Sequence, residues 1–436
     1  MVRQAHQPII RSLSLSKGQL SSANYHLTAE SYIYIMKFLD FLNFSVTPYH
    51  TVDCLKTLIN GINDESILLY ERGGALIAVR PPKEVCSDSK FRIALAHTDY
   101  PTLKISPNPD KSAAGVRTLH PEVYGSPLFT SWLDRDLGYA GLIAYEQGGR
   151  LHTKLVRGDK LFRIPQLAVH LNRGVNQEGL KVNPQTDLDA LWTSVGGKER
   201  FVDALQAEIP AGSRLLDFDI QLFDAQSAEF GGFDDEWVYS GRLDNLSSCH
   251  AIAEAFVTAE PLEYDFQVAA FFNNEEVGSE TREGAAGNFL KSVLDSLIPD
   301  SEFRTPNSFA LSIDMAHACH PNFVQKHETN HAPVLGGGVV LKVNSQKRYA
   351  SDVFSNARFK MLCEQSNVPY QTFVMRNDMP CGSTVGPTIS SSLGIPTVDI
   401  GEPMLSMHSI REMTDVRDHE NMTKLVSALY GNSNLA

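Results

Sequence analysis

Four short apolar runs in this sequence each lead to an acidic residue or a histidine, and they constrain the fold more than any other feature. The runs begin at Phe91, Phe266, Phe309 and Thr397. In chain order they lead to His97, to the pair Glu275-Glu276, to Asp314 and to a loop with His408. Short continuous apolar runs are typical of strands buried in a parallel sheet. Because ligands bind open α/β sheets just beyond the carboxyl ends of the strands, the runs predict one sheet whose edge gathers these side chains.

Glu275 and Glu276 are adjacent carboxylates at the end of the second of these runs. Their charges repel each other, and burial of either one without a partner costs several kcal/mol, so a bound metal ion is the strongest candidate for neutralising them. Consecutive side chains on extended backbone point in opposite directions, so one carboxylate can bind metal while the other faces a water molecule. The alternative is an exposed acidic turn.

A fifth candidate ligand, Asp244, precedes an alanine-rich segment of helical period that extends to about Ala259. The full candidate set has two imidazoles and three carboxylates: His97, Asp244, Glu276, Asp314 and His408. One bridging carboxylate and two further ligands on each side would hold two metals about 3.5–4 Å apart. Nitrogen and oxygen ligands without thiolate suit Zn²⁺, Mn²⁺ or Co²⁺. We expect Asp99, two residues after His97, to accept the ring N–H and orient the imidazole.

Eight motifs carry a resemblance to a known family. In chain order they are His97–Asp99, Thr130–Gly138, Val169–Arg173, Arg242–Leu246, Asn274–Glu280, Asp314–Ala318, Arg376–Thr384 and Met407–Glu412. From about residue 36 to the C-terminus, the chain resembles the M18 family of metalloaminopeptidases, the aspartyl aminopeptidase group. The resemblance implies a mixed-sheet α/β/α sandwich that hydrolyses the N-terminal residue of peptides with two zinc ions per subunit.

The resemblance also implies roles for the metal-site residues. Asp244 would bridge the two metals, with His97 and Asp314 on one side and Glu276 and His408 on the other. In the same family pattern, the carboxylate that precedes Glu276 would be the general base that takes a proton from the attacking water. The peptide bond that follows Asp244 matches a position where proteins of this clan often carry a cis bond.

Two further residues are linked to the substrate by the resemblance. His170 would reach an active site across a subunit contact and touch the substrate, although an alternative makes it a zinc ligand with His97 and His408. Lys342 ends the strand-like run that follows Gly336, and the family's preference for N-terminal Asp or Glu is tied to a lysine at this position. Because the net charge is -13, any attraction for acidic peptides must be local.

Two other hydrolase classes compete with the aminopeptidase interpretation. A related dizinc enzyme, such as a deacylase or a carboxypeptidase, would use the same metal site with a different pocket. The segment His327–His331 matches the H-E-x-x-H pattern of zincin proteases, which requires a helix. Pro321 lies before this segment, and Pro333 and Gly336 lie after it, so we expect a loop there and not a zincin site.

Composition excludes other classes of protein. The chain has 436 residues, a net charge of -13 and no cluster of Lys and Arg, so we expect no nucleic-acid partner. No apolar stretch approaches 18 residues, so we expect no membrane span. The cysteines show no C-x-x-C spacing, which favours reduced thiols and a cytoplasmic enzyme. Residues 1–29 lack Asp and Glu and are rich in serine, so residues 1–35 form an N-terminal extension, either disordered or an organelle-targeting segment.

The motif positions predict an interrupted catalytic domain, formed by residues 36–108 and 234–436. Residues 109–233 would be a β-rich insertion, which the family uses for dimer contacts and for assembly into a large hollow particle, here a dodecamer. Strands are expected at Leu142–Tyr145, Leu151–Val156 and Lys160–Ile164, and a helix near Gly196–Ala207. In the catalytic parts we expect helices at Ile33–Leu42, Asp352–Gln365 and Arg411–Leu429, and a helix capped by Gly382–Thr384 that extends to Leu393.

Overall fold

The computed structural model describes residues 37–431, apart from 87, 159, 198–199 and 299–307. The expected N-terminal extension and the first part of the expected helix Ile33–Leu42 therefore lie outside the described residues. The first described helix is α1 (Phe38–Phe44). Among the described residues, no helix combines the length and the apolar character that a bilayer-spanning segment needs.

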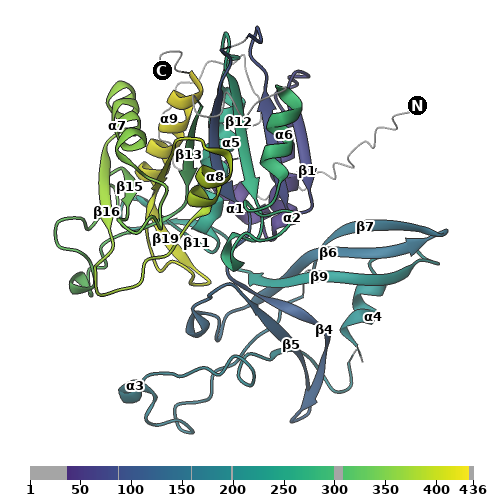
Figure 1. Cartoon of the computed structure of the whole chain (residues 1–436). Coiled ribbons are helices and arrows are strands. Elements are labelled where there is room, and N and C mark those ends of the chain that lie inside the picture. The colour runs from purple at the N-terminus through teal and green to yellow at the C-terminus, as the bar shows by residue number, and fades with distance from the viewer. Residues whose placement is uncertain (1–36, 87, 159, 198–199, 299–307, 432–436) are drawn as a thin grey trace. The chain divides into compact units, whose positions relative to one another are not determined.

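An eight-stranded mixed sheet forms the centre of the predicted catalytic domain, here called the catalytic part (Figure 1). In spatial order its strands are β1 (Leu68–Arg72), β2 (Ala75–Arg80), β12 (Phe266–Phe272), β3 (Phe91–His97), β13 (Phe309–Ile313), β17 (Thr397–Gly401), β15 (Val339–Val343) and β16 (Tyr370–Val374). The four strands β12, β3, β13 and β17 are consecutive parallel neighbours. They are the four apolar runs of the sequence, and every residue in them is buried. Because their direction is shared, their carboxyl ends meet at one edge.

Helices cover both faces of this sheet (Figure 1). One apolar core contains residues of α2 (Pro48–Asn60), α5 (Leu243–Thr258), α7 (Val353–Ser366) and α9 (Val416–Gly431). The core on the opposite face contains residues of α6 (Phe289–Leu297) and α8 (Val385–Leu393). Successive residues of β3 alternate between the two cores, as the two-residue period of a strand requires. The predicted α/β/α sandwich is therefore confirmed.

Two of the predicted helices begin where their capping residues indicate. The side chain of Asp352 accepts a hydrogen bond from the backbone N–H of Ser355 at the start of α7, in a capping box. The side chain of Thr384 caps α8, which ends at Leu393. Both helices are confirmed.

The helix expected at Arg411–Leu429 is wrong over its first residues. Glu412–Asp415 forms strand β19, and α9 begins only at Val416. This strand belongs to a five-stranded sheet of β10 (Glu229–Gly231), β11 (Trp237–Ser240), β19, β18 (Pro403–Leu405) and β14 (Ala316–His317). Thr414 pairs with β11 on one side and with β18 on the other. The backbone groups of this segment therefore form hydrogen bonds with neighbouring strands and not within a helix.

A third, antiparallel sheet comes from the middle of the chain. In spatial order its strands are β7 (Arg150–Arg157), β6 (Leu137–Gln147), β9 (Arg214–Asp224), β4 (Thr102–Ala113), β5 (Val116–Tyr124) and β8 (Ala190–Ser194). Two of the three strands expected in this region lie within β6 and β7. The third, Lys160–Ile164, forms only isolated bridges through Phe162 and Arg163. The short helices are α3 (Val175–Glu178) and α4 (Phe201–Gln206), and α4 is shorter than the expected Gly196–Ala207.

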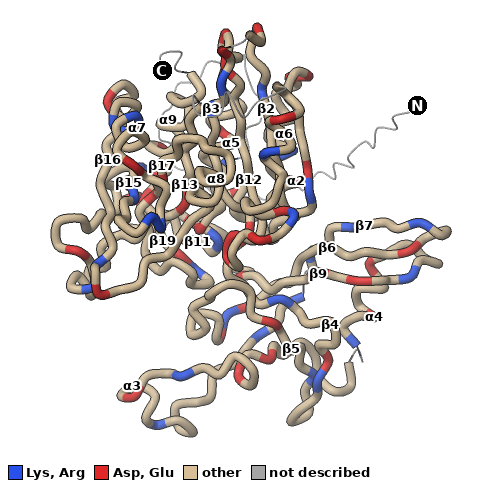
Figure 2. The backbone as a smooth tube through the Cα atoms, viewed as in Figure 1, with Lys and Arg blue, Asp and Glu red and all other residues tan. Residues whose placement is uncertain are grey.

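The third sheet is joined to the catalytic part by polar contacts. The Tyr49 hydroxyl on α2 donates to Asp219 on β9 at 2.8 Å, and the side-chain amide of Gln221 on β9 donates to the carbonyl of Val46 at 3.3 Å. Lys and Arg are interspersed with Asp and Glu along both the catalytic part and this sheet (Figure 2).

Candidate metal centre

The register of the central sheet brings three of the candidate residues to the same level. His97 is the last residue of β3 and pairs with Phe272, the last residue of β12. Asp314 directly follows β13, in which Ser312 pairs with Leu95 of β3. Glu275 lies three residues beyond the end of β12, on the 3-10 turn η2 (Glu275–Val277). The carboxyl ends of neighbouring parallel strands thus deliver one imidazole and several carboxylates to one place.

Asp244 comes from the irregular start of α5, where its ψ angle of 103° is not helical. The peptide bond between Asp244 and Asn245 is cis, which the sequence alone left open. The Asn245 side-chain amide donates to the carbonyl of Ile313 at 2.8 Å and so joins the start of α5 to the end of β13, next to Asp314. Asp244 is therefore held against the edge of the sheet.

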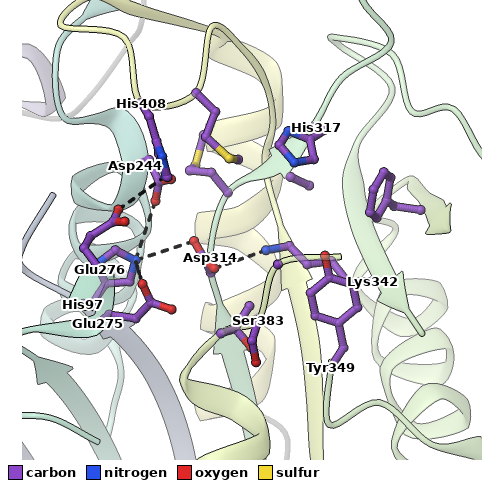
Figure 3. Close-up of a pocket in the computed structure, with 16 residues that line it drawn as sticks. His97, Asp244, Glu275, Glu276, Asp314, His317, Lys342, Tyr349, Ser383 and His408 are labelled. Atoms are coloured by element: carbon purple, nitrogen blue, oxygen red, sulfur yellow. Dashed lines mark ion pairs between the residues drawn. The ribbon is translucent and has the colours of Figure 1, made fainter. Parts of the chain in front are cut away.

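The two oxygens of Asp244 face two different histidines (Figure 3). Oδ1 lies 3.6 Å from His97 Nε2, which is also 3.6 Å from Asp314 Oδ1. Oδ2 lies 3.5 Å from His408 Nε2, which is also 3.5 Å from Glu276 Oε1. The five predicted ligands converge, and they form two groups that share the Asp244 carboxylate.

These groups fit divalent cations. Ligand atoms at about 2.1 Å from a tetrahedral zinc ion lie roughly 3.4 Å from one another, close to the separations between the imidazole nitrogens and the carboxylate oxygens. His97, Asp244 and Glu276 each offer an atom within 4.8 Å of the other two. Asp244 Oδ1 is buried and accepts no hydrogen bond from the described residues, as expected of an oxygen that lacks its cation.

Burial and negative charge shift the protonation of the whole site. Burial, with repulsion from Asp314 and Asp99, raises the pKa of Glu275 to about 8. Burial alone would lower the pKa of His408, but its contacts with Asp244 and Glu276 raise that pKa to about 10. In the absence of metal, protons on imidazole and carboxylate neutralise the cluster; bound cations would take over that task.

Asp99 is held in the site differently from the prediction. The ring nitrogen Nδ1 of His97 lies 3.0 Å from the backbone carbonyl of Asp99 and 3.5 Å from its carboxylate. The carboxylate instead accepts the backbone N–H groups of Glu275 and Glu276, both at 3.1 Å, and the hydroxyl of Tyr124 at 2.7 Å. Asp99 therefore fixes the turn that carries the two glutamates.

Sequence reasoning missed Glu412, the last residue of a motif that it had identified. Its buried carboxylate accepts the backbone N–H of Asp244 at 3.1 Å and that of His408 at 2.7 Å. Burial and the charge of Asp244 raise its pKa to about 8. The Glu412 carboxylate thus holds both Asp244 and His408 in position through their backbone N–H groups. The adjacency of Glu412 to the His408 loop was the available signal, but the sequence places it in an expected helix.

Lys342 lies in the same pocket as the five converging residues (Figure 3). Its ammonium group is buried, lies 3.4 Å from Asp314 Oδ2 and sits 5.6 Å from the centre of the Tyr349 ring. Ser383 also lines this pocket, just before α8. The charge of Lys342 and the contact with His97 outweigh burial and keep the pKa of Asp314 below its usual value.

Of the residues predicted to bind metal, to contact substrate or to act as the base, His170 alone does not line this pocket. It is exposed on a turn of the segment between β7 and β8 and is absent from the residues that line the pocket. Within a single chain, the structure therefore does not bring His170 together with the other predicted site residues.

The zincin alternative is wrong. The described backbone at His327–His331 is not helical, because the 3-10 turn η5 (Val324–Lys326) ends before it and His327 is extended, with a ψ angle of 154°. His331 pairs with Glu328 of the same motif, and His327 Nε2 accepts the backbone N–H of His320. The two imidazoles do not share the helical face that the zincin motif requires.

Comparisons with known proteins identify the family of this chain. The family described as "Aminopeptidase I zinc metalloprotease (M18)" matches residues 41–430. The "Probable M18 family aminopeptidase 2" of Pseudomonas aeruginosa (strain UCBPP-PA14) is 39% identical over 422 residues, which cover 91% of this chain and 98% of that protein.

Solved structures of similar chains have the same fold. A chain in the cryo-EM structure of the Ape4 and Nbr1 complex superposes with a TM-score of 0.85 and 33% identity, over 90% of this chain and 84% of that one. The structure of the S. cerevesiae mApe1 dodecamer superposes with a TM-score of 0.78 and 27% identity, over 91% of this chain and 96% of that one. The matching family and the Pseudomonas aeruginosa relative are named as aminopeptidases and not as deacylases or carboxypeptidases. Together with the match over residues 41–430, they show that this chain belongs to the M18 family of zinc metalloaminopeptidases.

Proposed function

We propose that the enzyme removes N-terminal residues with two zinc ions, which share the Asp244 carboxylate. His97 and Asp314 would complete one site, and Glu276 and His408 the other. The observation that carries this proposal is the position of the Asp244 carboxylate, whose two oxygens face different imidazoles at 3.6 and 3.5 Å. When bound, the two metals lower the pKa of a water molecule and polarise the scissile carbonyl.

Glu275 is the proposed general base. Its Oε2 lies 3.9 Å from His97 Nε2, so it borders the proposed metal site without completing either group of ligands. The carboxylate takes the proton of the attacking water and later gives it to the leaving amine. Asp99 keeps Glu275 in place through the backbone N–H of that residue.

The preference for N-terminal Asp or Glu is proposed from the surroundings of Lys342. A buried ammonium in the pocket is suited to pair with a carboxylate side chain of the substrate. Without metal, Lys342 pairs with Asp314. A cation bound to Asp314 would take up the charge of that carboxylate and leave the ammonium available for the substrate.

Substitution Lys342→Ala should lower kcat/KM for an Asp-terminal peptide by about tenfold to a hundredfold more than for an Ala-terminal peptide, because a charge-assisted contact is lost only with the acidic substrate. Steady-state kinetics with both peptides measure the ratio. Lys326→Ala is the matched control, since Lys326 is exposed and lies outside this pocket, and both rates should stay unchanged. An equal loss on both peptides would mean that Lys342 only holds Asp314 in position.

His170 is proposed to act in the active site of a second subunit. It is exposed on its own chain, and the neighbouring residues Leu167, Val169 and Leu171 are 62%, 49% and 75% exposed. Apolar side chains gathered on an exposed segment favour contact with another protein surface. We therefore propose that residues 109–233 form a dimerisation module and that the dimers build a dodecamer, the assembly named for the S. cerevesiae mApe1 structure.

Subunit mixing tests this role of His170. His170→Ala alone should lower kcat by about a hundredfold, as loss of one donor to the reacting oxygen does. Equal amounts of His170→Ala and Glu275→Gln chains, dissociated and reassembled, should recover about a quarter of wild-type activity, because half of random dimers are mixed and each holds one intact site. The same chains combined without dissociation serve as the control. If activity does not recover after reassembly, His170 acts in the active site of its own chain.

We also propose that the enzyme works in the cytoplasm. All six cysteines are free thiols, which is the form expected in a reducing compartment.

A further inference from the structure

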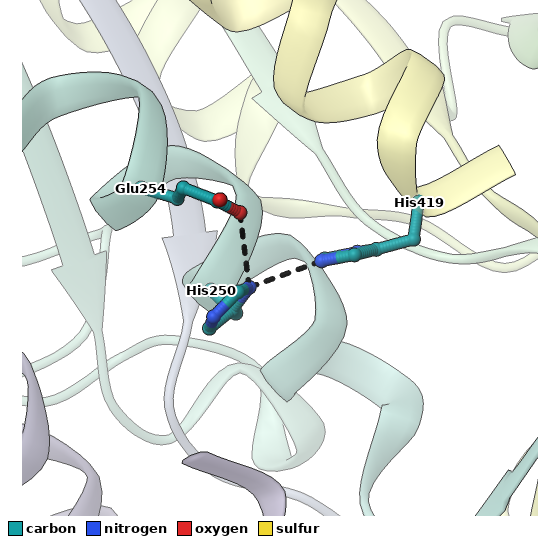
Figure 4. Close-up of side chains that lie close together, drawn as sticks. All are labelled: His250, Glu254 and His419. Atoms are coloured by element: carbon teal, nitrogen blue, oxygen red, sulfur yellow. Dashed lines mark hydrogen bonds and ion pairs between the residues drawn. The ribbon is translucent and has the colours of Figure 1, made fainter. Parts of the chain in front are cut away.

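A second cluster of metal-ligand side chains lies outside the catalytic pocket (Figure 4). His250 and Glu254 are one turn apart on α5, and His419 comes from α9. Each offers one ligand atom, and the three atoms lie within 4.8 Å of one another. Both imidazoles are buried, whereas the Glu254 side chain is 36% exposed, so the cluster is open to solvent on the carboxylate side.

We propose that this cluster is a third zinc site, structural and separate from the catalytic pair. His250 Nδ1 lies 3.0 Å from His419 Nε2 and 3.7 Å from Glu254 Oε2. Tetrahedral zinc with bonds of about 2.1 Å separates its ligand atoms by roughly 3.4 Å, so shifts of a few tenths of an ångström would complete the site. Three protein ligands leave the fourth position for water on the exposed side.

Glu402 orients the His419 ring for metal binding. Its buried carboxylate lies 3.1 Å from His419 Nδ1 and accepts the hydroxyl of Ser247 at 2.6 Å. A proton on Nδ1 that is donated to Glu402 leaves the lone pair of His419 on Nε2, the atom that faces His250. A carboxylate behind a histidine fixes the tautomer and raises the basicity of the metal-binding nitrogen.

The aromatic surroundings favour a fixed site. The ring of Phe38 is stacked on His419 with centroids 3.8 Å apart, and Phe41 lies 5.4 Å from His250. An apolar wall limits water access to the imidazoles and strengthens their interaction with a cation. The alternative to a bound cation is a hydrogen bond between His250 and His419. That hydrogen bond does not include Glu254, whose carboxylate lies 3.7 Å from His250 Nδ1, beyond hydrogen-bond distance.

A cation here would join two helices that support the catalytic centre. The helix α5 begins with the residues around Asp244, six residues before His250, and α9 follows strand β19, which carries Glu412. Because the cation would bind the folded chain only, it would stabilise the native state by mass action. Its predicted effect is therefore on thermal stability more than on the chemical step.

Zinc content separates this site from the catalytic pair. Purified wild-type enzyme should hold about three zinc ions per chain, Glu254→Gln or His250→Gln about two, and Asp244→Asn about one. His120→Gln, which alters a histidine paired with Asp189 in the third sheet, is the matched control and should keep three. A wild-type content of two that neither Glu254→Gln nor His250→Gln lowers would overturn the third site while the catalytic pair stands. Loss of zinc in Asp244→Asn tests the catalytic pair alone.

Diffraction from wild-type crystals gives a test that needs no variant. Data collected on both sides of the zinc absorption edge, without added metal, should show an anomalous peak about 2.1 Å from His250 Nδ1 and His419 Nε2. The peaks at the catalytic residues serve as the internal control. Catalytic peaks with none between His250 and His419 would mean that the imidazoles share only a proton, and the proposal would be withdrawn. Glu254→Gln should also lower Tm, whereas kcat at a temperature well below Tm should change less than twofold.

Discussion

Glu275→Gln should lower kcat by about 10²–10⁴-fold and leave the zinc content unchanged. The amide has the shape of the carboxylate but cannot take the proton of the attacking water. Since Glu275 completes neither group of ligands around Asp244, the metals should remain bound. Turnover of an Asp-terminal peptide, measured beside zinc analysis of the same sample, checks both parts of this expectation.

A neighbouring glutamate provides the matched control for this substitution. Glu280 is exposed on the segment that follows η2, so Glu280→Gln should keep wild-type kcat and zinc content. Normal turnover in Glu275→Gln would show that another group is the base. A combined loss of zinc and activity would instead make Glu275 a ligand.

Removal of the metal ions should lower peptide cleavage by about a hundredfold or more, and addition of zinc should restore it. Without cations, the carboxylates of the site are balanced by Lys342 and by protons, and no metal is present to activate the water or the scissile carbonyl. Dialysis against a strong chelator, followed by assay before and after addition of zinc, measures the effect. Cleavage that continues in the metal-free protein would contradict the proposed chemistry.

Asp244→Asn distinguishes a bridging carboxylate from an ordinary ligand. If both metals share Asp244, loss of its charge should weaken both sites, and zinc should not restore activity to this variant. Its zinc content should fall by about two ions per chain. If the zinc content falls by only one ion per chain and the affinity for the other catalytic ion is unchanged, Asp244 is a ligand of a single metal.

The strands and their ligand-bearing ends could be predicted from local sequence. A continuous apolar run such as Phe91–Ala96 has one favourable environment, the interior of a parallel sheet, so its end and the histidine that follows are readily located. The start of the helix expected from Asp352 was located for a similar reason, because the structure shows that this side chain bonds to backbone only three residues away.

Predictions failed where partners distant in sequence decided the local structure. Glu412–Asp415 is a strand because β11 and β18 supply hydrogen bonds on both sides, and those strands lie far away or beyond a loop in the sequence. The positioning role of Glu412 was missed for the same reason. Asp99 was expected to serve His97, its neighbour in sequence, but its carboxylate accepts backbone N–H groups more than 170 residues away.

The sequence by itself determined the family, the central sheet and the residue types that could chelate metal, because these follow from apolar patterning and from motifs carried on short segments. Only the tertiary structure decided the distances between the side chains around Asp244, which carboxylates orient them and that His250 meets His419 across two helices. The physical reason is that sequence specifies short-range preferences, whereas the direction of a side chain and the distance to its partner depend on how separate elements pack.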